Sequence, residues 1–377
     1  MKKVFYLLSL VILLTAGSCK KEQPGNEENN NGGEEPEVLA DASLNKVIVP
    51  GIAVNGQQVQ IKGTIQNFGE APITSMDISW KVDNGSEHSM SLTGLNIAKM
   101  GIYNFTHDTP YQATVGNHTI TVTISNVNGK EHDAMDANNL RNAEILVASQ
   151  GVQRRVLYEE FTSSSCNPCA SFNSNYFTPD YLRTNARKVS VIKYQMNWPG
   201  NGDPYYTDEG GVRRHYYGVN GVPSLYMDGR EGTHFNQAQL QQDLDREYGV
   251  PAIIELEAYY VILPDSTVKV KVIGTPYVSG NLKLHVAVVE KTTTRNATTN
   301  GETEFHNVMM KMVPNARGTD VTATDGTTFT KRVQASLTGT HIEEITDLEV
   351  VVFIQNDSDK SVLQSAIATE DASQIDF

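Results

Sequence analysis

Two cysteines, Cys166 and Cys169, stand three positions apart in the segment 161–170 (FTSSSCNPCA). They follow a strand-like run at 154–161 and precede a segment, 170–187, that can be helical. A cysteine pair on the first turn of a helix can close a small disulfide ring, and the helix N-terminus stabilises a thiolate on the first sulfur. The spacing therefore indicates thiol–disulfide exchange, in which Cys166 attacks a substrate disulfide and Cys169 resolves the mixed disulfide.

The remaining cysteine supports this pairing. The chain has three cysteines, and Cys19 belongs to the export signal described below, so Cys166 and Cys169 have only each other as partners. A zinc site normally needs four ligands, and the sequence offers no second cysteine pair or histidine cluster. We therefore predict no metal and no cofactor. A structural disulfide remains the alternative, because exported proteins often carry disulfides, although so short a loop removes little unfolded-state entropy.

Other elements are expected to position the pair. A buried strand is predicted at 188–196 (KVSVIKYQM) and a short strand at 225–227, followed by the turn Asp228-Gly229, which favours a hairpin. A helix is predicted at 236–248. This order of elements indicates an α/β domain over residues 152–250.

Two further features make that segment resemble the thioredoxin superfamily. Glu160 stands six residues before Cys166, and Gly221-Val222-Pro223-Ser224 precedes the short strand. The resemblance implies a buried acid, Glu160, that exchanges a proton with Cys169, and a cis Val222–Pro223 bond whose loop aligns the substrate backbone. The sequence departs from the superfamily at Ser165, where thioredoxins usually carry tryptophan.

An insertion at 197–220 separates the buried strand from the Pro223 loop and is rich in aromatic and basic residues. By the superfamily's topology it lies near the disulfide and can form one wall of a peptide groove. Alternatively, its aromatic rings pack the insertion onto the domain, since such rings bury large areas. The candidate groove residues are Trp198, Tyr205, Tyr206, Arg213, Arg214 and Tyr216.

The first 19 residues have the form of an export signal. Lys2 and Lys3 are followed by an apolar run at 4–14 that is too short to span a membrane. Ala16-Gly17-Ser18-Cys19 resembles a bacterial lipoprotein cleavage box, which implies that Cys19 is diacylated and anchors the mature chain in a membrane. An uncut transmembrane anchor is the alternative.

Residues 20–38 contain six glutamates and almost no apolar side chains, so a disordered acidic tether is predicted. The tract resembles a surface-export signal of some Gram-negative lipoproteins, and a simple solvated spacer is the alternative. The whole chain has a formal charge of −14, and loss of Lys2 and Lys3 makes it −16. This charge argues against nucleic acid as a partner.

Two β-rich segments flank the α/β segment. Residues 39–149 contain strand-length runs such as 118–125 (HTITVTIS), in which apolar residues alternate strictly. They predict an immunoglobulin-type sandwich and resemble the cell-adhesion-related domain of bacterial surface proteins. Residues 251–377 contain six or seven strand-length runs, which predict a second β-sandwich.

The segment 305–314 (FHNVMMKMVP) lies in this last part. Its methionines and His306 could bind Cu(I), but a hydrophobic strand, with Met310 and Met312 on the face of Val308, is the better account. With the signal and the cysteine motif, the segment resembles the family named after a twenty-eight-kilodalton outer-membrane protein of Gram-negative anaerobes. That resemblance covers residues 152 to about 370 and implies an outer-membrane location, facing the periplasm or the cell surface.

The sequence thus predicts a multidomain chain with an Ig-like β-sandwich, a thioredoxin-like α/β domain and a second β-sandwich. Two functions remain open. In the first, the protein is a lipid-anchored thiol–disulfide oxidoreductase that acts on protein or peptide thiols and disulfides. In the second, it is a surface interaction or adhesion lipoprotein, its disulfide is structural, and its partner lies in the envelope or on a host surface.

Overall fold

The computed structural model describes residues 38–232 and 235–376. The predicted signal peptide, Cys19 and almost all of the predicted tether lie outside these residues. Within the described part, no helix is long and apolar enough to cross a membrane. Strands dominate the chain and fall into several sheets, so the prediction of a mostly β, multidomain protein is confirmed.

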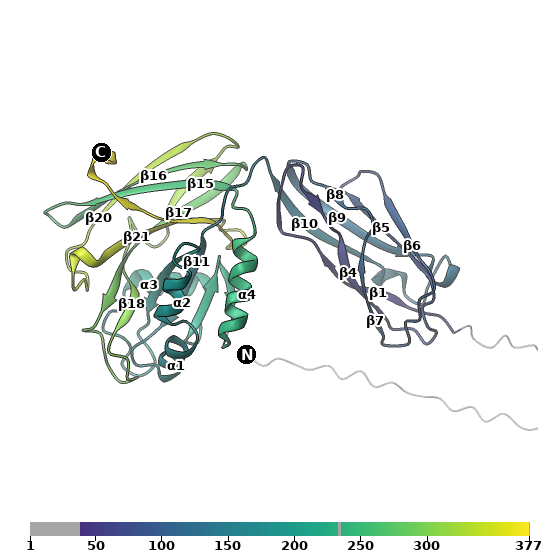
Figure 1. Cartoon of the computed structure of the whole chain (residues 1–377), viewed down its shortest axis with the longest axis horizontal. Helices are drawn as coiled ribbons and strands as arrows, with labels where there is room; N and C mark the ends of the chain where they lie inside the picture. Colours follow the sequence, from purple (N-terminus) through teal and green to yellow (C-terminus); the bar gives the residue numbers. More distant parts are fainter. Residues whose placement is uncertain (1–37, 233–234, 377) are drawn as a thin grey trace, which may run out of the picture. The chain divides into compact units, whose positions relative to one another are not determined.

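Residues 40–148 form a β-sandwich (Figure 1). Ile120, Val122 and Ile124, the alternating residues of the 118–125 run, are all buried in its core. The first sheet contains β1 (Ala42–Ile48), β4 (Lys62–Asn67) and β7 (Ile102–Thr106). The second contains β2 (Ile52–Val54), β10 (Leu140–Ala148), β9 (Gly116–Ser125), β5 (Met76–Val82) and β6 (His88–Leu92). β3 (Gln58–Val59) and β8 (Tyr111–Gln112) form a separate pair.

The second half of the chain is built on a nine-stranded sheet. The sequence predicted a separate sandwich for residues 251–377. However, β18 (Phe305–Val313) pairs in parallel with β12 (Val189–Gln195), so the last third of the chain continues the same sheet. Its order is β14 (Arg230–Gly232), β13 (Ser224–Met227), β11 (Val156–Thr162), β12 (Val189–Gln195), β18 (Phe305–Val313), β17 (Gly280–Thr293), β21 (Leu348–Gln355) and β22 (Val362–Ile367). The ninth strand, β19 (Thr319–Ala323), pairs with β17.

This sheet curls back on itself. Ser365 Oγ in β22 donates to the carbonyl of Arg155, just before β11, at 2.8 Å. One apolar core therefore contains side chains from β11, β12, β17, β18 and β21. The opposite faces of β17 and β21 pack against a four-stranded sheet of β20 (Phe329–Ser336), β16 (Thr267–Pro276), β15 (Ile254–Ile262) and β23 (Thr369–Glu370).

Four helices accompany the first half of the large sheet (Figure 1). The predicted helix at 170–187 is in fact two, because Thr178 caps a new helix and Pro179 cannot continue the old one. The helices are α1 (Asn167–Asn175), α2 (Pro179–Thr184), α3 (Asp208–Tyr217) and α4 (Gln237–Tyr248). Side chains of α1, α2 and α4 share a core with one face of β11 and β12.

Two local predictions are tested by the strands. Asp228 and Gly229, both with positive φ, join β13 to β14, so the predicted hairpin is confirmed. A Cβ on Gly229 would also lie 1.8 Å from the Lys360 carbonyl oxygen. The methionine segment is a buried strand, as predicted, but Met312 packs with Met309 rather than with Met310. A register shift opposite Val288 and Val289 changes the alternation there.

Candidate functional site

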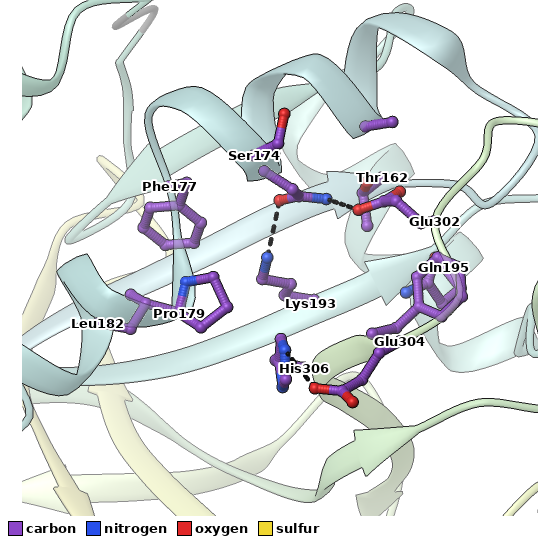
Figure 2. A pocket seen from close by; sticks show the side chains of 13 residues that line it. Thr162, Ser174, Phe177, Pro179, Leu182, Lys193, Gln195, Glu302, Glu304 and His306 are labelled. Atoms are coloured by element: carbon purple, nitrogen blue, oxygen red, sulfur yellow. Dashed lines mark hydrogen bonds and ion pairs between the residues drawn. The ribbon is translucent and has the colours of Figure 1, made fainter.

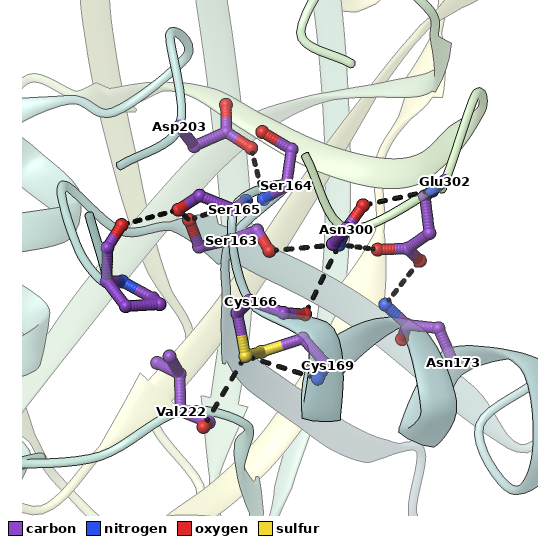
Figure 3. Close-up of a disulfide and its surroundings, with 11 residues drawn as sticks. Ser163, Ser164, Ser165, Cys166, Cys169, Asn173, Asp203, Val222, Asn300 and Glu302 are labelled. Atoms are coloured by element: carbon purple, nitrogen blue, oxygen red, sulfur yellow. Dashed lines mark hydrogen bonds between the residues drawn. A yellow bond between two sulfur atoms is a disulfide. The ribbon is translucent and has the colours of Figure 1, made fainter. Parts of the chain in front are cut away.

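Cys166 and Cys169 form a disulfide at the start of α1, directly after β11 (Figure 3). Cys166 is the N-cap residue, and its Sγ accepts a hydrogen bond from Cys169 N at 3.2 Å. Its Sγ lies 3.6 Å from the carbonyl oxygen of Val222, which is joined to Pro223 by a cis bond. The structure therefore places the three predicted residues Cys166, Cys169 and Pro223 in one region.

The disulfide is buried. Cys166 is 1% exposed and Cys169 is 0% exposed. Exchange requires a thiolate to reach a sulfur atom, so its rate depends on access. In this conformation neither sulfur is open to a protein thiol.

The segment 294–304 is joined to the cysteine motif by hydrogen bonds (Figure 3). Asn300 N donates to Ser164 O at 3.0 Å, and its side-chain amide donates to Ser163 O at 3.2 Å and Cys166 O at 3.4 Å. Thr298 Oγ1 adds a bond to Ser164 Oγ at 3.0 Å. This segment holds the residues before Cys166 in place.

A buried aspartate supports the same turn from the other side. Asp203 Oδ2 accepts from Ser164 N at 2.9 Å, and its Oδ1 accepts from Tyr205 N at 2.8 Å. Burial raises the pKa of the Asp203 carboxyl, and these two hydrogen bonds oppose that rise. Nothing in the spacing of Asp203 and Ser164, 39 positions apart, pointed to this contact.

Glu160 is buried on the face of the sheet that packs against α1, but it is not alone. Lys193 Nζ lies 2.8 Å from Glu160 Oε2 and donates to Asn173 Oδ1 at 2.8 Å. The two residues are register partners in the parallel strands β11 and β12. The predicted proton carrier is therefore half of a buried ion pair, a partner that the sequence analysis missed.

A depression lies beside the cis-proline loop. Its lining includes Pro168, Pro223, Tyr226, Glu231 and the exposed Phe235. None of the six predicted groove residues belongs to this lining. The predicted Pro223 lines this depression, as do Tyr217, Gly218, Val219 and Asn220 at the end of the insertion, but the other lining residues were not predicted.

Each of the six residues has a packing role instead. Arg213 is fully buried against Glu159, and Tyr205 stacks on His341 and donates to Glu343. Arg214 lies over the Trp198 ring, with 4.4 Å between the guanidinium carbon and the ring centroid. Tyr216 donates to Asp357, and the Tyr206 hydroxyl lies against Gly211. These contacts favour the alternative in which the aromatic and basic residues pack the insertion onto the domain.

The most extensive buried polar network lies around Glu159, on the other face of β11 from Glu160. Arg213 Nη2 donates to Glu159 Oε1 at 2.7 Å, and Tyr194 OH donates to the same oxygen at 2.8 Å. Tyr217 OH donates to Glu159 Oε2, and Arg213 Nη1 donates to Gln355 Oε1 at 3.0 Å. Burial, followed by the charge of Glu159, raises the pKa values of Tyr194 and Tyr217. These phenols are therefore hydrogen-bond donors, and the network is structural.

Comparison with known proteins identifies one family. Residues 213–371 match the model of the outer membrane protein Omp28 family. The resemblance predicted from the sequence is thus confirmed over that part of the chain, which is less than half of its length. No curated protein matches the chain.

Several solved structures are similar at low identity. HBP35 of Porphyromonas gingivalis is 15% identical, with a TM-score of 0.49, over 60% of this chain and 81% of that one. A domain of the outer membrane lipoprotein Omp28 from Porphyromonas gingivalis is 15% identical, with a TM-score of 0.24, over 32% and 89%. A CARDB domain from Pyrococcus furiosus, solved with di-metal ions, is 12% identical, with a TM-score of 0.23, over 29% and 89%. These values are too low to assign a function, and they give no support to a thioredoxin domain.

Proposed function

We propose that this chain is a lipid-anchored outer-membrane lipoprotein that acts as a surface interaction protein, with Cys166–Cys169 as a structural disulfide. The burial of both sulfurs carries this proposal. A disulfide that a thiolate cannot reach does not undergo exchange, so its role is structural. Here it fixes the turn between β11 and α1, to which segment 294–304 is bonded.

The location rests on two further observations. The sequence begins with a lipoprotein-like signal that ends at Cys19, and residues 213–371 resemble the outer membrane protein Omp28 family. The two β-rich parts of the chain offer broad surfaces, and the negative charge of the chain disfavours nucleic acid. The partner is then a protein of the envelope or of a host surface.

Cell fractionation tests the anchor and the location. We expect the wild-type protein in the outer-membrane fraction and the Cys19→Ala variant in the soluble fraction. Protease added to intact cells should remove the wild-type protein and spare a periplasmic marker. Wild-type protein in the soluble fraction would refute the anchor, and protection in intact cells would refute surface display.

The state of the disulfide provides a separate prediction. We expect the native protein to resist reduction by glutathione and to show a potential below about −300 mV, as buried structural disulfides do. Equilibration with glutathione, followed by thiol trapping in native and in denatured protein, measures this. A potential between about −270 and −120 mV without denaturant would contradict the structural assignment.

Thiol–disulfide exchange by a thioredoxin-like domain is the second candidate, and one observation favours it. Cys166 is at the N-terminus of α1, its sulfur lies beside the cis Val222–Pro223 loop, and a depression adjoins that loop. Exchange would require a movement that exposes the sulfur of Cys166, which is 1% exposed. The Cys169→Ser variant should then accumulate mixed disulfides with other proteins, and Cys166→Ser should not. Equal absence of adducts in both variants excludes this candidate.

A further inference from the structure

A cavity of about 160 Å³ lies behind the disulfide, between α1, the start of α2 and the carboxyl ends of β11 and β12 (Figure 2). Residues of the segment 302–306, which leads into β18, also line it. In α/β structures ligands bind outside the carboxyl ends of parallel strands, which is where this cavity lies. Its lining is Thr162, Ala170, Asn173, Ser174, Phe177, Pro179, Leu182, Lys193, Gln195, Glu302, Glu304, Phe305 and His306.

Two pairs of register partners lie next to each other at this end of the sheet. Glu160 pairs with Lys193, and Thr162 pairs with Gln195, in the parallel strands β11 and β12. Since side chains alternate along a strand, all four lie on the face that carries Tyr158 and Val191 into the core below α1. Three of them, Thr162, Lys193 and Gln195, line the cavity, whereas Glu160 does not.

Several of these polar atoms lack partners. Among the described residues that line the cavity, Thr162 Oγ1 and both polar atoms of the Gln195 side chain make no hydrogen bond. Thr162 and Gln195 are each only 2% exposed. An unpaired buried polar group destabilises the folded protein, so such groups normally bind water or a ligand. Figure 2 shows Thr162 and Gln195 in the cavity wall beside Glu302 and Lys193.

Negative charge dominates the cavity. Lys193 is its one lysine or arginine, and it is neutralised by Glu160. Glu302 and Glu304 remain, and of these Glu304 has only His306 beside it, at 3.1 Å. Burial raises the pKa of Glu302, against the hydrogen bonds from Asn173 and Asn300. The cavity thus favours a cation.

Basic residues of an adjoining depression do not offset this charge, because each faces an acid of its own. Arg183 lies 2.9 Å from Asp180, Lys291 lies 3.5 Å from Asp347, and Arg155 interacts with Glu349.

The rest of the wall is apolar. Phe177, Pro179, Leu182, Ala170 and Phe305 supply its apolar lining. Figure 2 shows Phe177, Pro179 and Leu182 on the side of the cavity away from Thr162 and Gln195. A ligand that fits therefore has hydrogen-bond donors and a positive charge at one end and a short hydrocarbon chain at the other. A protonated primary amine has three donors and no acceptor, which matches the unpaired oxygens of Thr162 and Gln195 and the carboxylates of Glu302 and Glu304.

We propose that this cavity binds a primary alkylammonium group, held by Thr162 Oγ1 and Gln195 Oε1 beside the carboxylates of Glu302 and Glu304. The group belongs either to a small free amine or to a lysine side chain of a partner. This inference stands independently of the proposed function, because it holds whether the disulfide is structural or reactive.

Calorimetric titration of the full chain at neutral pH tests it, with n-butylamine as the cationic probe. Butyrate and n-butanol are the anionic and neutral probes of similar size. We expect n-butylammonium to bind at least about tenfold more tightly than either, since a hydrogen bond to a charged group contributes about that factor. A blocked lysine, Nα-acetyl-lysine methylamide, distinguishes the source. Tighter binding than n-butylammonium indicates a partner's side chain, and weaker binding a free amine.

Two variants locate the site. Thr162→Val and Gln195→Leu should each weaken n-butylammonium about tenfold while leaving the stability of the free protein unchanged or increased, because each removes an unpaired buried polar group. Thr330→Val and Gln334→Leu, at exposed positions of β20, are the matched controls and should bind as the wild type does. Absence of binding by either amine, equal binding of butyrate, or unchanged binding by Thr162→Val and Gln195→Leu would each overturn the proposal.

Discussion

Replacing Arg213 by methionine is expected to lower the free energy of unfolding of residues 152–377 by about 3–5 kcal/mol. Arg213 and Glu159 are both 1% exposed in their side chains, and 2.7 Å separates Arg213 Nη2 from Glu159 Oε1. Without the guanidinium, Glu159 remains as a buried charge with only Tyr194 and Tyr217 as donors. Urea unfolding followed by the fluorescence of Trp198, in a Trp80→Phe background, measures the change.

Two comparisons separate the loss of charge from the loss of packing. Arg183→Met removes an exposed ion pair with Asp180 and should cost less than about 1 kcal/mol. Adding Glu159→Gln to Arg213→Met should recover part of the lost stability, because it removes the uncompensated charge. If Arg213→Met costs no more than Arg183→Met, the buried pair does not stabilise this part of the chain.

The sequence analysis selected Arg213 as a residue of a peptide groove, but in the structure it is the buried ion-pair partner of Glu159. Tyrosines and arginines that gather in an insertion are typical of binding surfaces and of packed cores alike, because both bury aromatic area. The two cases differ in whether the protein interior contains a buried carboxylate with which the arginine can pair. Glu159 belongs to a strand in which all seven residues are buried, and it is adjacent in sequence to Glu160. Two consecutive buried acids on opposite faces of one strand require two cationic partners, here Arg213 and Lys193. That requirement could have been read from the sequence.

Local features around the disulfide were predictable because each depends on few neighbouring residues. The pairing of Cys166 with Cys169, the Asp228-Gly229 turn and the helix predicted at 236–248, which is α4, are examples. The pairing of β12 with β18 was not, since periodicity identifies a strand but not its neighbour. All residues of β12 are buried, which indicates a central strand with a neighbouring strand on each side. Nothing in the sequence near β12 indicates that residues 305–313 form one of these neighbours.

The contacts of segment 294–304 were hidden for a similar reason. Its composition, rich in threonine and asparagine, is typical of a solvated loop. The same side chains are short hydrogen-bonding groups, and Asn300 uses its amide to bond the backbone carbonyls of Ser163 and Cys166. The backbone around Cys166 is thus held partly by a segment more than 130 residues away in the sequence. Only the folded chain shows that this segment is bonded to the motif.

Between about pH 4 and pH 6 the free energy of unfolding should contain a contribution from Asp228 that falls by about 3 kcal/mol as the pH rises. Asp228 is buried, and its carboxylate accepts from Arg154 Nη1 at 2.8 Å and from Leu157 N at 2.7 Å. Burial outweighs these interactions and raises the pKa of Asp228 from 3.8 to about 6. In that pH range the folded state therefore binds more protons than the unfolded state, so folding is favoured at the lower pH.

The Asp228→Asn variant cannot titrate and should lack this contribution. Its absolute stability will also change, because Arg154 loses its anion, so the slope of unfolding free energy against pH is the quantity to compare. Urea unfolding at four pH values from 4 to 7, again followed through Trp198, gives both slopes. Other buried acids with raised pKa values, such as Glu302, act equally in both proteins and cancel. Asp245→Asn is the matched control, because the hydrogen bond from Lys188 lowers the pKa of Asp245, and its contribution therefore changes mainly below the pH range measured. Parallel slopes for wild type and Asp228→Asn would show that the pKa of Asp228 is the same in the folded and unfolded states, so that its bonds to Arg154 and Leu157 cancel the effect of burial.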